Sequence, residues 1–296
     1  MTRNSPPTNT QAKNVVSVDF EDYYHVEAFS RQVNRQEWAS FPSRIERNTH
    51  QVLDVLDAAG VSATFFMLGW AAERYPQIVR EIVNRGHEAA CHSYWHRLIY
   101  NLTPEEFRQD TILAKDTIEQ ASGVAVVGYR APSFSIVERS WWAFEILAEL
   151  GFQYDSSVFP IRHDTYGIPA APRRPFEVDT PHGSIREYPM TTFRFGSNAN
   201  LPVAGGGYLR LFPFFYTRFG VSRAAAEHVP VIAYIHPWEF DADQPRITGG
   251  SMKSRIRHYT NLAETKTRFT SLLRLVPFTS FREVMLTSKG EQDRTV

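Results

Sequence analysis

The sequence predicts an α/β fold: a deformed (β/α) barrel of parallel strands, built as a single domain. Short apolar segments alternate with segments of helical periodicity along most of the 296 residues, and strand-then-helix order favours a parallel sheet. Polar residues follow several apolar segments directly, at the strand ends where α/β barrels assemble their sites. No repeat and no internal linker divides the chain, so one domain is expected over residues 14–286.

In the first half of the chain, short apolar strands are separated by helices with clear end signals. The strands are expected at residues 14–20, 62–68 and 87–91. The helices are expected at residues 45–59, 76–84 and 103–121. Glycines end the first two helices, and the third begins at Thr103 with proline at the first helical position and acids in the first turn.

The alternation continues in the second half around a β-rich middle. Strands are expected at residues 124–129, 185–190, 231–235 and 278–281. Helices are expected at residues 140–150 and 252–275. The run Gly205-Gly206-Gly207 is typical of a turn or of a close approach between backbone segments.

The composition indicates a globular protein with no overall attraction to nucleic acid or to an anionic membrane. Lys and Arg number 32 and Asp and Glu also number 32, so the formal net charge is zero. The aromatic content of 14% fits either a larger core or a groove whose rings stack on sugars. The single cysteine, Cys91, excludes a disulfide framework and a thiolate-rich zinc cluster, and it is expected to be a small buried strand residue.

Polar segments flank the expected domain. Residues 1–13 are expected to form a disordered lead, and residues 287–296 a disordered tail. No signal peptide is recognisable, and no run of about 18 apolar residues occurs. We therefore expect no integral membrane segment and a cytoplasmic location.

The pentad His92-Ser93-Tyr94-Trp95-His96 is the most informative motif in the chain. Two histidines four residues apart can direct both imidazoles to one point, and a carboxylate from Asp19-Phe20-Glu21-Asp22 would complete three protein ligands for a divalent metal. Three protein ligands leave a coordination position open for water, as in hydrolytic metal centres. Imidazole and carboxylate ligands suit Zn²⁺, with Co²⁺, Ni²⁺ or Mn²⁺ as substitutes.

An ordered series of short motifs extends over nearly the whole chain. They are Val18-Asp19-Phe20-Glu21-Asp22, Thr64-Phe65-Phe66, the histidine pentad, Arg130-Ala131-Pro132-Ser133, Tyr154-Asp155-Ser156-Ser157 and Ile235-His236-Pro237. The series resembles the polysaccharide deacetylase family, the carbohydrate esterase group with the NodB homology domain. The segments 205–210 and 236–239 resemble the subgroup found beside exosortase and exopolysaccharide-biosynthesis loci. The resemblance implies a deformed barrel, a divalent metal and removal of acetyl groups from N-acetylated sugars.

The resemblance also implies catalytic roles for residues at the ends of the expected strands. Asp19 fits the base by position and by family, and Arg130 would orient that carboxylate and keep it ionised. His236 resembles the catalytic acid of the family. Asp155 is the expected partner that fixes the tautomer or charge of His236, unless it forms a turn by hydrogen-bonding its own backbone.

Two residues compete for the metal carboxylate, because the first motif departs from the family pattern of adjacent aspartates. Side chains two residues apart on a strand share a face, so Glu21 shares the face of Asp19 and is the first choice. Asp22 is the alternative if the strand has already turned. The acid that is not used is expected to accept a hydrogen bond from a histidine N–H.

Residues beside these motifs are candidates for contacts with the substrate. Pro132 stiffens the loop after Arg130, so a backbone N–H of Ser133 or Phe134 can be directed at an oxyanion. Tyr208 and Trp238 lie next to functional segments and could either stack on a sugar ring or pack at the rim.

Together the motifs predict a metal-dependent hydrolase that removes N-acetyl groups from an N-acetylhexosamine-containing polysaccharide or its lipid-linked precursor, in exopolysaccharide or cell-envelope glycan biosynthesis. Two other functions stay open: an amidohydrolase acting on a small non-sugar amide, similar to allantoinases, and an inactive carbohydrate-binding domain. The joint presence of Asp19, His92, His96, Arg130 and His236 argues against an inactive domain. No nucleic-acid partner is expected, and the sequence does not indicate an oligomeric state.

Overall fold

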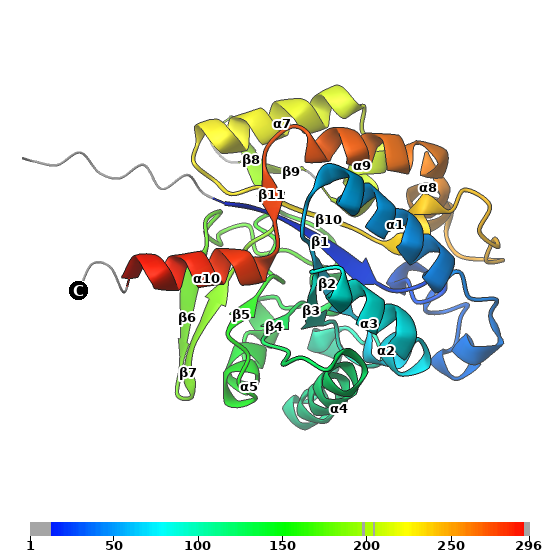
Figure 1. Cartoon of the computed structure of the whole chain (residues 1–296), viewed down its shortest axis with the longest axis horizontal. Coiled ribbons are helices and arrows are strands. Elements are labelled where there is room, and N and C mark those ends of the chain that lie inside the picture. The colour runs from blue at the N-terminus through cyan, green and yellow to red at the C-terminus, as the bar shows by residue number, and fades with distance from the viewer. Residues whose placement is uncertain (1–12, 197–198, 204, 293–296) are drawn as a thin grey trace, which may run out of the picture.

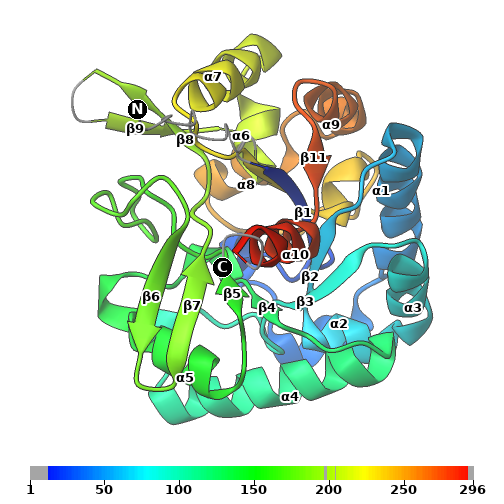
Figure 2. The same cartoon turned by 60° about the vertical axis from the view of Figure 1, so that its left-hand side comes forward.

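A computed structural model describes residues 13–196, 199–203 and 205–292, and it confirms the predicted α/β fold class (Figure 1). The strands are β1 (Asn14–Phe20), β2 (Thr64–Met67), β3 (Glu88–Cys91), β4 (Gly128–Tyr129), β5 (Tyr154–Asp155), β6 (Phe176–Thr180), β7 (Gly183–Glu187), β8 (Thr192–Phe195), β9 (Ala199–Pro202), β10 (Ile232–Ile235) and β11 (Phe278–Thr279). The α-helices are α1 (Ile45–Ala59), α2 (Gly69–Arg74), α3 (Pro76–Asn84), α4 (Pro104–Ser122), α5 (Ala143–Glu149), α6 (Gly206–Leu211), α7 (Phe214–Ala226), α8 (Met252–Tyr259), α9 (Thr265–Leu273) and α10 (Phe281–Gln292). Figure 2 shows the strands curving around the centre of the molecule, with most helices outside the curve.

The main sheet is parallel, and this brings the functional strand ends to one rim. Its order is β10-β1-β2-β3-β4-β5-β7-β6, with β11 also paired to β1, and only β6 runs antiparallel to its neighbour. In β1, Val18 lies opposite Ile235 of β10 and Phe65 of β2. Because these strands run in the same direction, the residues that follow β1, β3, β4, β5 and β10 emerge on the same side.

A side chain makes hydrogen bonds at the place where β10 and β7 do not pair through their backbones. Among the described residues, β10 does not pair directly with β7, so the sheet is curved but not closed. Thr191 lies between them: its Oγ1 accepts a hydrogen bond from the N–H of Ile232 and lies 3.2 Å from the carbonyl oxygen of Pro230. The hairpin of β8 and β9 forms a separate two-stranded sheet. This arrangement matches the deformed barrel that the sequence predicts.

Helix α10 closes the amino-terminal end of the sheet, opposite the functional rim. Its first residue, Phe281, is fully buried and packs against Phe66 and Tyr154. The N–H groups of Phe281 and Arg282 donate to Oγ1 of Thr64 at 2.9 Å and to Oε2 of Glu88 at 2.8 Å. These bonds satisfy backbone donors that the start of a helix otherwise leaves free. The last helix is therefore anchored to β2 and β3.

Several local predictions differ from the structure, among them the strand expected at 278–281, which ends at Thr279 before α10 begins at Phe281. The predicted helix over 252–275 is two helices, α8 and α9, because Asn261 adopts a left-handed φ of 54° between them. The predicted disordered tail is wrong as far as Gln292, since α10 continues to that residue, and residues 293–296 lie outside the described residues. The predicted strand at 124–129 is reduced to β4. Of the predicted lead, only residue 13 is described.

Cys91 ends β3 and is buried, as predicted, and burial raises the pKa of its thiol. Among the helices that the structure describes, none combines the length and apolar character needed to cross a bilayer.

Candidate metal centre and active site

Three buried side chains converge at the carboxyl ends of β1 and β3: Glu21, His92 and His96. One ligand atom from each lies within 4.8 Å of the corresponding atoms of the other two. Glu21 comes one residue after β1, and His92 follows β3 directly. Because β1 and β3 both pair with β2 in parallel, their ends bring the acid and the two imidazoles to the same part of the rim.

The imidazole of His92 is held in one tautomer by the backbone. Its Nδ1 lies 2.8 Å from the carbonyl oxygen of Arg130, an acceptor, so Nδ1 carries the proton and Nε2 keeps a free lone pair. Burial lowers the pKa of His92 to about 4. The side chain is therefore neutral near neutral pH, which is the form that binds a metal ion.

His96 and Glu21 face each other without forming a hydrogen bond of good geometry. Nε2 of His96 lies 3.0 Å from Oε2 of Glu21, yet Oε2 has no hydrogen-bond partner in the described residues. Burial raises the pKa of Glu21, but the neighbouring imidazoles, His96 above all, outweigh it and hold the pKa well below its usual range. A buried, ionised carboxylate with an unbonded oxygen beside two imidazoles fits a divalent cation.

The loop that carries the two histidines has an unusual backbone and is fixed by α4. Ser93 and His96 have positive φ values of 66° and 51°, which non-glycine residues seldom adopt. The carboxylate of Asp110 accepts hydrogen bonds from Oγ of Ser93 and from the N–H of Tyr94, both at 2.8 Å. Asp110 thus compensates for the strain and sets the position of both imidazoles.

Asp22, the alternative metal carboxylate, lies outside this cluster. Its Oδ1 accepts the N–H of Tyr23 at 2.9 Å, and its Oδ2 accepts the N–H of Arg44 at 2.7 Å and Oγ of Ser43 at 2.8 Å. These bonds order the segment before α1. The prediction that the unused acid accepts a hydrogen bond from a histidine side chain is therefore wrong. The geometry favours Glu21 as the carboxylate ligand of the metal, as the two-residue period of the strand predicts.

Asp19 is oriented by a buried guanidinium. Nη1 of Arg130 donates to Oδ1 of Asp19 at 2.7 Å and to Oγ of Ser17 at 2.8 Å, and Nε donates to the carbonyl oxygen of Ser156 at 3.1 Å. The guanidinium also lies 4.1 Å above the ring of Phe66. Oδ1 is thereby fixed, and Oδ2 is left to face the cluster as an acceptor with a defined direction.

His236 reaches the same point from β10 and lies between acids. Its Nε2 is 3.5 Å from Oε1 of Glu21 and 3.8 Å from Oδ2 of Asp19, and its Nδ1 is 3.5 Å from Oε1 of Glu239. Burial lowers the pKa of His236, but Glu239 and then the other two acids outweigh burial and raise the pKa to about 9. The imidazole can therefore donate a proton at neutral pH.

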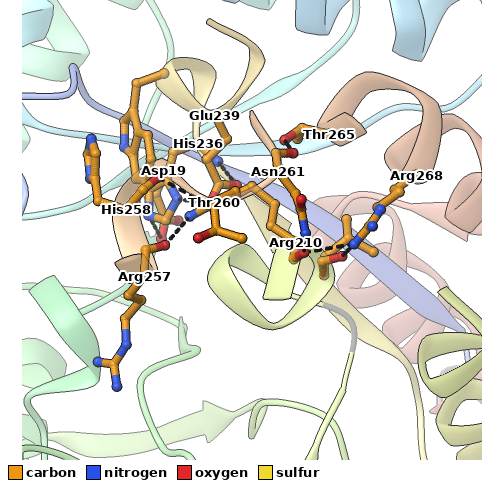
Figure 3. Close-up of polar contacts among 12 residues, drawn as sticks. Asp19, Arg210, His236, Glu239, Arg257, His258, Thr260, Asn261, Thr265 and Arg268 are labelled. Carbon is orange, nitrogen blue, oxygen red and sulfur yellow. Dashed lines mark hydrogen bonds and ion pairs between the residues drawn. The ribbon is translucent and has the colours of Figure 1, made fainter. Parts of the chain in front are cut away.

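Glu239 is fixed in turn by a second buried arginine (Figure 3). Nε of Arg210 donates to Oε1 of Glu239 at 3.1 Å, and both side chains are about 1% exposed. The Nη groups of Arg210 donate to the carbonyl oxygens of Arg257, His258 and Thr260, at the end of α8. His236 and Asp19 are thus both backed by a buried arginine, directly for Asp19 and through Glu239 for His236.

The prediction that Asp155 is the partner of His236 is wrong. Its carboxylate accepts hydrogen bonds from the N–H of Ser157 at 2.9 Å and from Oγ of Ser157 at 2.8 Å, which is the turn that the sequence left open as the alternative. Burial raises the pKa of Asp155 to about 6, and the equally buried Glu187 interacts with it. Glu239, from the segment of His236 itself, occupies the partner's place.

Ser133 and Phe134 line the cavity in a strained loop. Both have positive φ, 52° and 54°. The N–H of Phe134 donates to the carbonyl oxygen of Ala131 at 3.0 Å. The N–H of Ser133 is therefore the better candidate for an oxyanion donor.

Tyr208 and Trp238 differ in their suitability for sugar stacking. Tyr208 lines the cavity, and its hydroxyl lies 2.9 Å from that of Tyr166. Trp238 is stacked between His236 and His258, with ring centroids 5.1 Å and 4.2 Å away, and is 4% exposed. Both faces of Trp238 are covered, so it packs beneath the site, and the prediction that it could stack on a sugar is wrong.

These residues open into one cavity of about 710 Å³. That volume lies in the range of small-molecule pockets. The cavity is lined by the acids and imidazoles of the site: Asp19, Glu21, His92, His96, His236 and Glu239. The rings of Tyr166 and Tyr208 form part of its wall.

Sequence reasoning missed three residues that shape this site. Glu239 stands three residues after His236 inside a motif that had been singled out, so the spacing alone could have identified it. Arg210 ends the glycine-containing segment 205–210, but nothing in the sequence shows that it is buried. Asp110 carries no signal, because an acid within an amphipathic helix is an ordinary surface residue.

Two family models match the chain, one over each half. The family model described as Polysaccharide deacetylase matches residues 8–154, and the model described as Domain of unknown function (DUF3473) matches residues 156–286. The peptidoglycan-N-acetylglucosamine deacetylase of Bacillus cereus is 36% identical over 98 residues, which are 33% of this chain and 36% of that protein. The chitooligosaccharide deacetylase of a Bradyrhizobium species is 31% identical over 100 residues, 34% of this chain and 43% of that protein.

The chain thus spans less than half the length of these curated relatives. A crystal structure described as a candidate polysaccharide deacetylase from Mycobacterium smegmatis shares the fold. The alignment covers 98% of this chain and 96% of that chain, with a TM-score of 0.63 and 19% identity.

Proposed function

Because the chain belongs to the polysaccharide deacetylase family, whose model matches residues 8–154, we propose that it is a metal-dependent hydrolase that removes N-acetyl groups from an N-acetylhexosamine-containing glycan. The observation that carries this proposal is the meeting of Glu21, His92 and His96 beside Asp19 and His236 in one cavity. The peptidoglycan and chitooligosaccharide deacetylases among the relatives support a sugar of the N-acetylglucosamine type.

Glu21, His92 and His96 would hold the divalent metal, with Zn²⁺ as first choice and Co²⁺, Ni²⁺ or Mn²⁺ as substitutes. A bound divalent ion supplies polarisation of the acetyl carbonyl and a more acidic water. The site suits this use because His92 is neutral and Glu21 is ionised, as their lowered pKa values indicate.

The protein's own groups would perform the proton transfers. Asp19 takes the proton of the attacking water on Oδ2, since Arg130 occupies Oδ1. The N–H of Ser133 donates to the oxyanion that forms on the acetyl carbonyl. His236 then gives a proton to the departing amine nitrogen, and Glu239 stabilises the charged imidazole until it does.

The proposed substrate is a glycan of the cell envelope or of an exopolysaccharide, either as polymer or as lipid-linked precursor. The names of the curated relatives and the motifs at 205–210 and 236–239 support this class. The cavity has room for more of the substrate than an acetamido group, and Tyr208 offers a ring at its wall.

The decisive experiment measures acetate released from a panel of N-acetylated and O-acetylated glycans, with and without added Zn²⁺. The panel includes small non-sugar N-acetyl amides, and hydrolysis of a short ureide, which releases no acetate, is followed separately by its carboxylate product. We expect acetate from N-acetylglucosamine oligomers, lost after chelation and restored by metal. The variant Asp19→Asn serves as the inactive control. Turnover of only the small amides, or none with any substrate when metal is bound, would overturn the proposal.

A further inference from the structure

Four exposed phenylalanines gather beside one another on the surface. Phe195 on β8, Phe212 directly after α6, and Phe215 and Phe219 on α7 have exposed fractions of 67%, 37%, 68% and 54%. We call these four residues the aromatic face. Figure 2 shows α7 at the margin of the molecule, with the β8–β9 hairpin beside it. Contiguous exposed apolar side chains on this scale mark an interaction site more often than ordinary surface.

Ring contacts seat two of these phenylalanines on the residues beside them, and helix α7 contacts β8. The two phenylalanines on α7 are four residues apart and so point to the same side of the helix. Phe212 stacks on Tyr216 of α7, with 4.6 Å between centroids. Phe219 packs edge-on against Phe193 of β8 at 5.6 Å, and Phe195 ends that strand.

Exposed arginines outnumber acids beside the aromatic face, although the whole chain is neutral. Residues 205–226 contain no acidic residue, and of their three arginines Arg210 is buried against Glu239 while Arg218 and Arg223 are exposed. On α7, Arg218 and Arg223 lie on either side of the row of rings, by the rotation of about 100° per residue in an α-helix. Arg223 lies 3.5 Å from Glu227, and Arg218 is exposed with no ion-pair partner in the described part of the chain.

Two neighbouring regions are also rich in basic residues and poor in acidic ones. A second cavity near the end of α7 is lined by Arg173, Arg174 and Arg194, with Glu227 as its acid. Helix α8, which contacts α6, contains no acidic residue and exposes Met252 and Ile256, at 78% and 55%. Although the net charge of the chain is zero, arginines are therefore locally in excess next to exposed apolar side chains.

We infer that the aromatic face docks on the surface of an anionic lipid bilayer. A helix with rings on its outer side and arginines along both edges suits the interface, where rings enter the headgroup boundary and guanidinium groups meet lipid phosphates. A glycan is a poorer occupant, because the rings of α7 project from a convex helix and the aliphatic Met252 and Ile256 on α8 cannot stack on sugars.

The aromatic face begins at the wall of the catalytic cavity. Tyr208, which lines the cavity, stacks on Phe212 with 6.3 Å between ring centroids. Docking would hold the mouth of the cavity near the bilayer, where a lipid-linked glycan is available. This use of docking rests on the proposed function, whereas docking itself does not and is measured without substrate.

The test is sedimentation of the full chain with vesicles of phosphatidylcholine alone and of equal parts phosphatidylcholine and phosphatidylglycerol. We expect binding to the anionic vesicles at low salt and release at high salt. The variant Phe215→Ser/Phe219→Ser should lower the partition coefficient by roughly tenfold for each ring lost. Arg218→Glu should lower it by roughly fivefold or more and reduce the salt dependence.

The matched control is Ile112→Ser/Leu113→Ser, which removes two exposed apolar side chains, 40% and 46% exposed, from α4 instead. It should bind vesicles like the unmodified chain. Circular dichroism and acetate release from a short oligosaccharide should be unchanged in every variant, which separates lost docking from lost folding or lost function.

Four outcomes would overturn the inference. The first is no binding of the unmodified chain to anionic vesicles at low salt. The second is equal binding by the double phenylalanine variant. The third is a dimer that becomes monomeric in that variant, without any vesicle binding. The fourth is a raised KM for long N-acetylglucosamine oligomers in that variant, again without vesicle binding. Those last results would assign the aromatic face to a second copy of the chain or to the glycan.

Discussion

The variant Glu239→Gln would measure how strongly the carboxylate of the buried Arg210–Glu239 ion pair raises the pKa of His236. Oε1 of Glu239 lies 3.5 Å from Nδ1 of His236. At an effective dielectric constant of about 20, two unit charges at that distance attract by roughly 5 kcal/mol. One pKa unit corresponds to about 1.4 kcal/mol, so the carboxylate can raise the pKa of His236 by up to roughly 3 units. That gain, together with smaller contributions from Glu21 and Asp19, outweighs burial and brings the pKa to about 9.

Glutamine keeps the shape of Glu239 and an oxygen for Nε of Arg210, but it removes the negative charge. We expect the pKa of His236 to fall by on the order of 2–3 units. The protonated imidazole is the form that gives a proton, so turnover falls as pH rises through its pKa. The variant should therefore lose activity at a lower pH. Near neutral pH, amide hydrolysis should fall by roughly 2- to 10-fold, the loss of protonated imidazole that such a shift produces, and recover at acid pH.

The assay is the pH dependence of acetate release from an N-acetylglucosamine oligomer, with metal content and thermal unfolding measured on the same samples. Glu264→Gln, at an exposed glutamate, and Asp155→Asn, at the partner expected from the sequence, are the matched controls. Both should keep the basic limb of the profile in place. An unshifted limb in Glu239→Gln, or a shift in Asp155→Asn, would refute the assignment of Glu239 as the partner of His236.

The other predictions concern the metal, the base, the acid and the buried turn. Glu21→Gln should lose more metal affinity in equilibrium dialysis than Asp22→Asn, and the opposite order would contradict the strand-face argument. Asp19→Asn should keep its metal yet lose turnover by on the order of 10²–10⁴-fold, because Asp19 lies outside the ligand triad; loss of the metal would make it a ligand. His236→Ala should cut amide hydrolysis by about 10²–10⁴-fold and largely spare an activated aryl acetate, whose leaving group needs no proton; equal losses would exclude the acid role. Burial raises the pKa values of Asp155 and of the neighbouring Glu187, so the protonated pair stabilises the fold fully below the ordinary carboxyl range, and this contribution is lost as pH rises above it. Asp155→Asn should therefore flatten the fall in unfolding free energy over that range, as measured by denaturant unfolding at two pH values.

Local signals predicted most of the fold because they act within a few residues. The threonine at 103 forms the capping box with Glu106 that its spacing suggests, and Gly60 and Gly123 end their helices in the left-handed conformation. The break at Asn261 was not predictable in the same way. There the exposed carbonyl oxygens at the end of α8 are bound by Arg210, a residue about fifty positions earlier.

In the candidate site, too, features set by nearby residues were predictable from the sequence, and features set by distant residues were not. The two-residue period of a strand depends only on β1, and in the structure Glu21 lies beside the two histidines while Asp22 bonds the segment before α1; that Glu21 binds the metal stays a prediction. The partner of His236 was assigned wrongly to Asp155, since both lie after strands on the same rim and sequence order cannot show which acids meet. Trp238 was misjudged for a related reason: its burial depends on His258, which comes from α8.

The pairing of β1 has a consequence for how the chain is made. Val15 lies opposite Ile232, so β1 meets this neighbour only after more than two hundred further residues have been added. Until then one edge of β1, with its valines, has unpaired backbone groups, which is the kind of edge that pairs wrongly with other strands. The two matched regions, 8–154 and 156–286, contribute to one continuous sheet and cannot be separated as independent modules. The three candidate metal ligands all lie in the first matched region, whereas His236 and Glu239 lie in the second, so the candidate site is complete only when both regions are present.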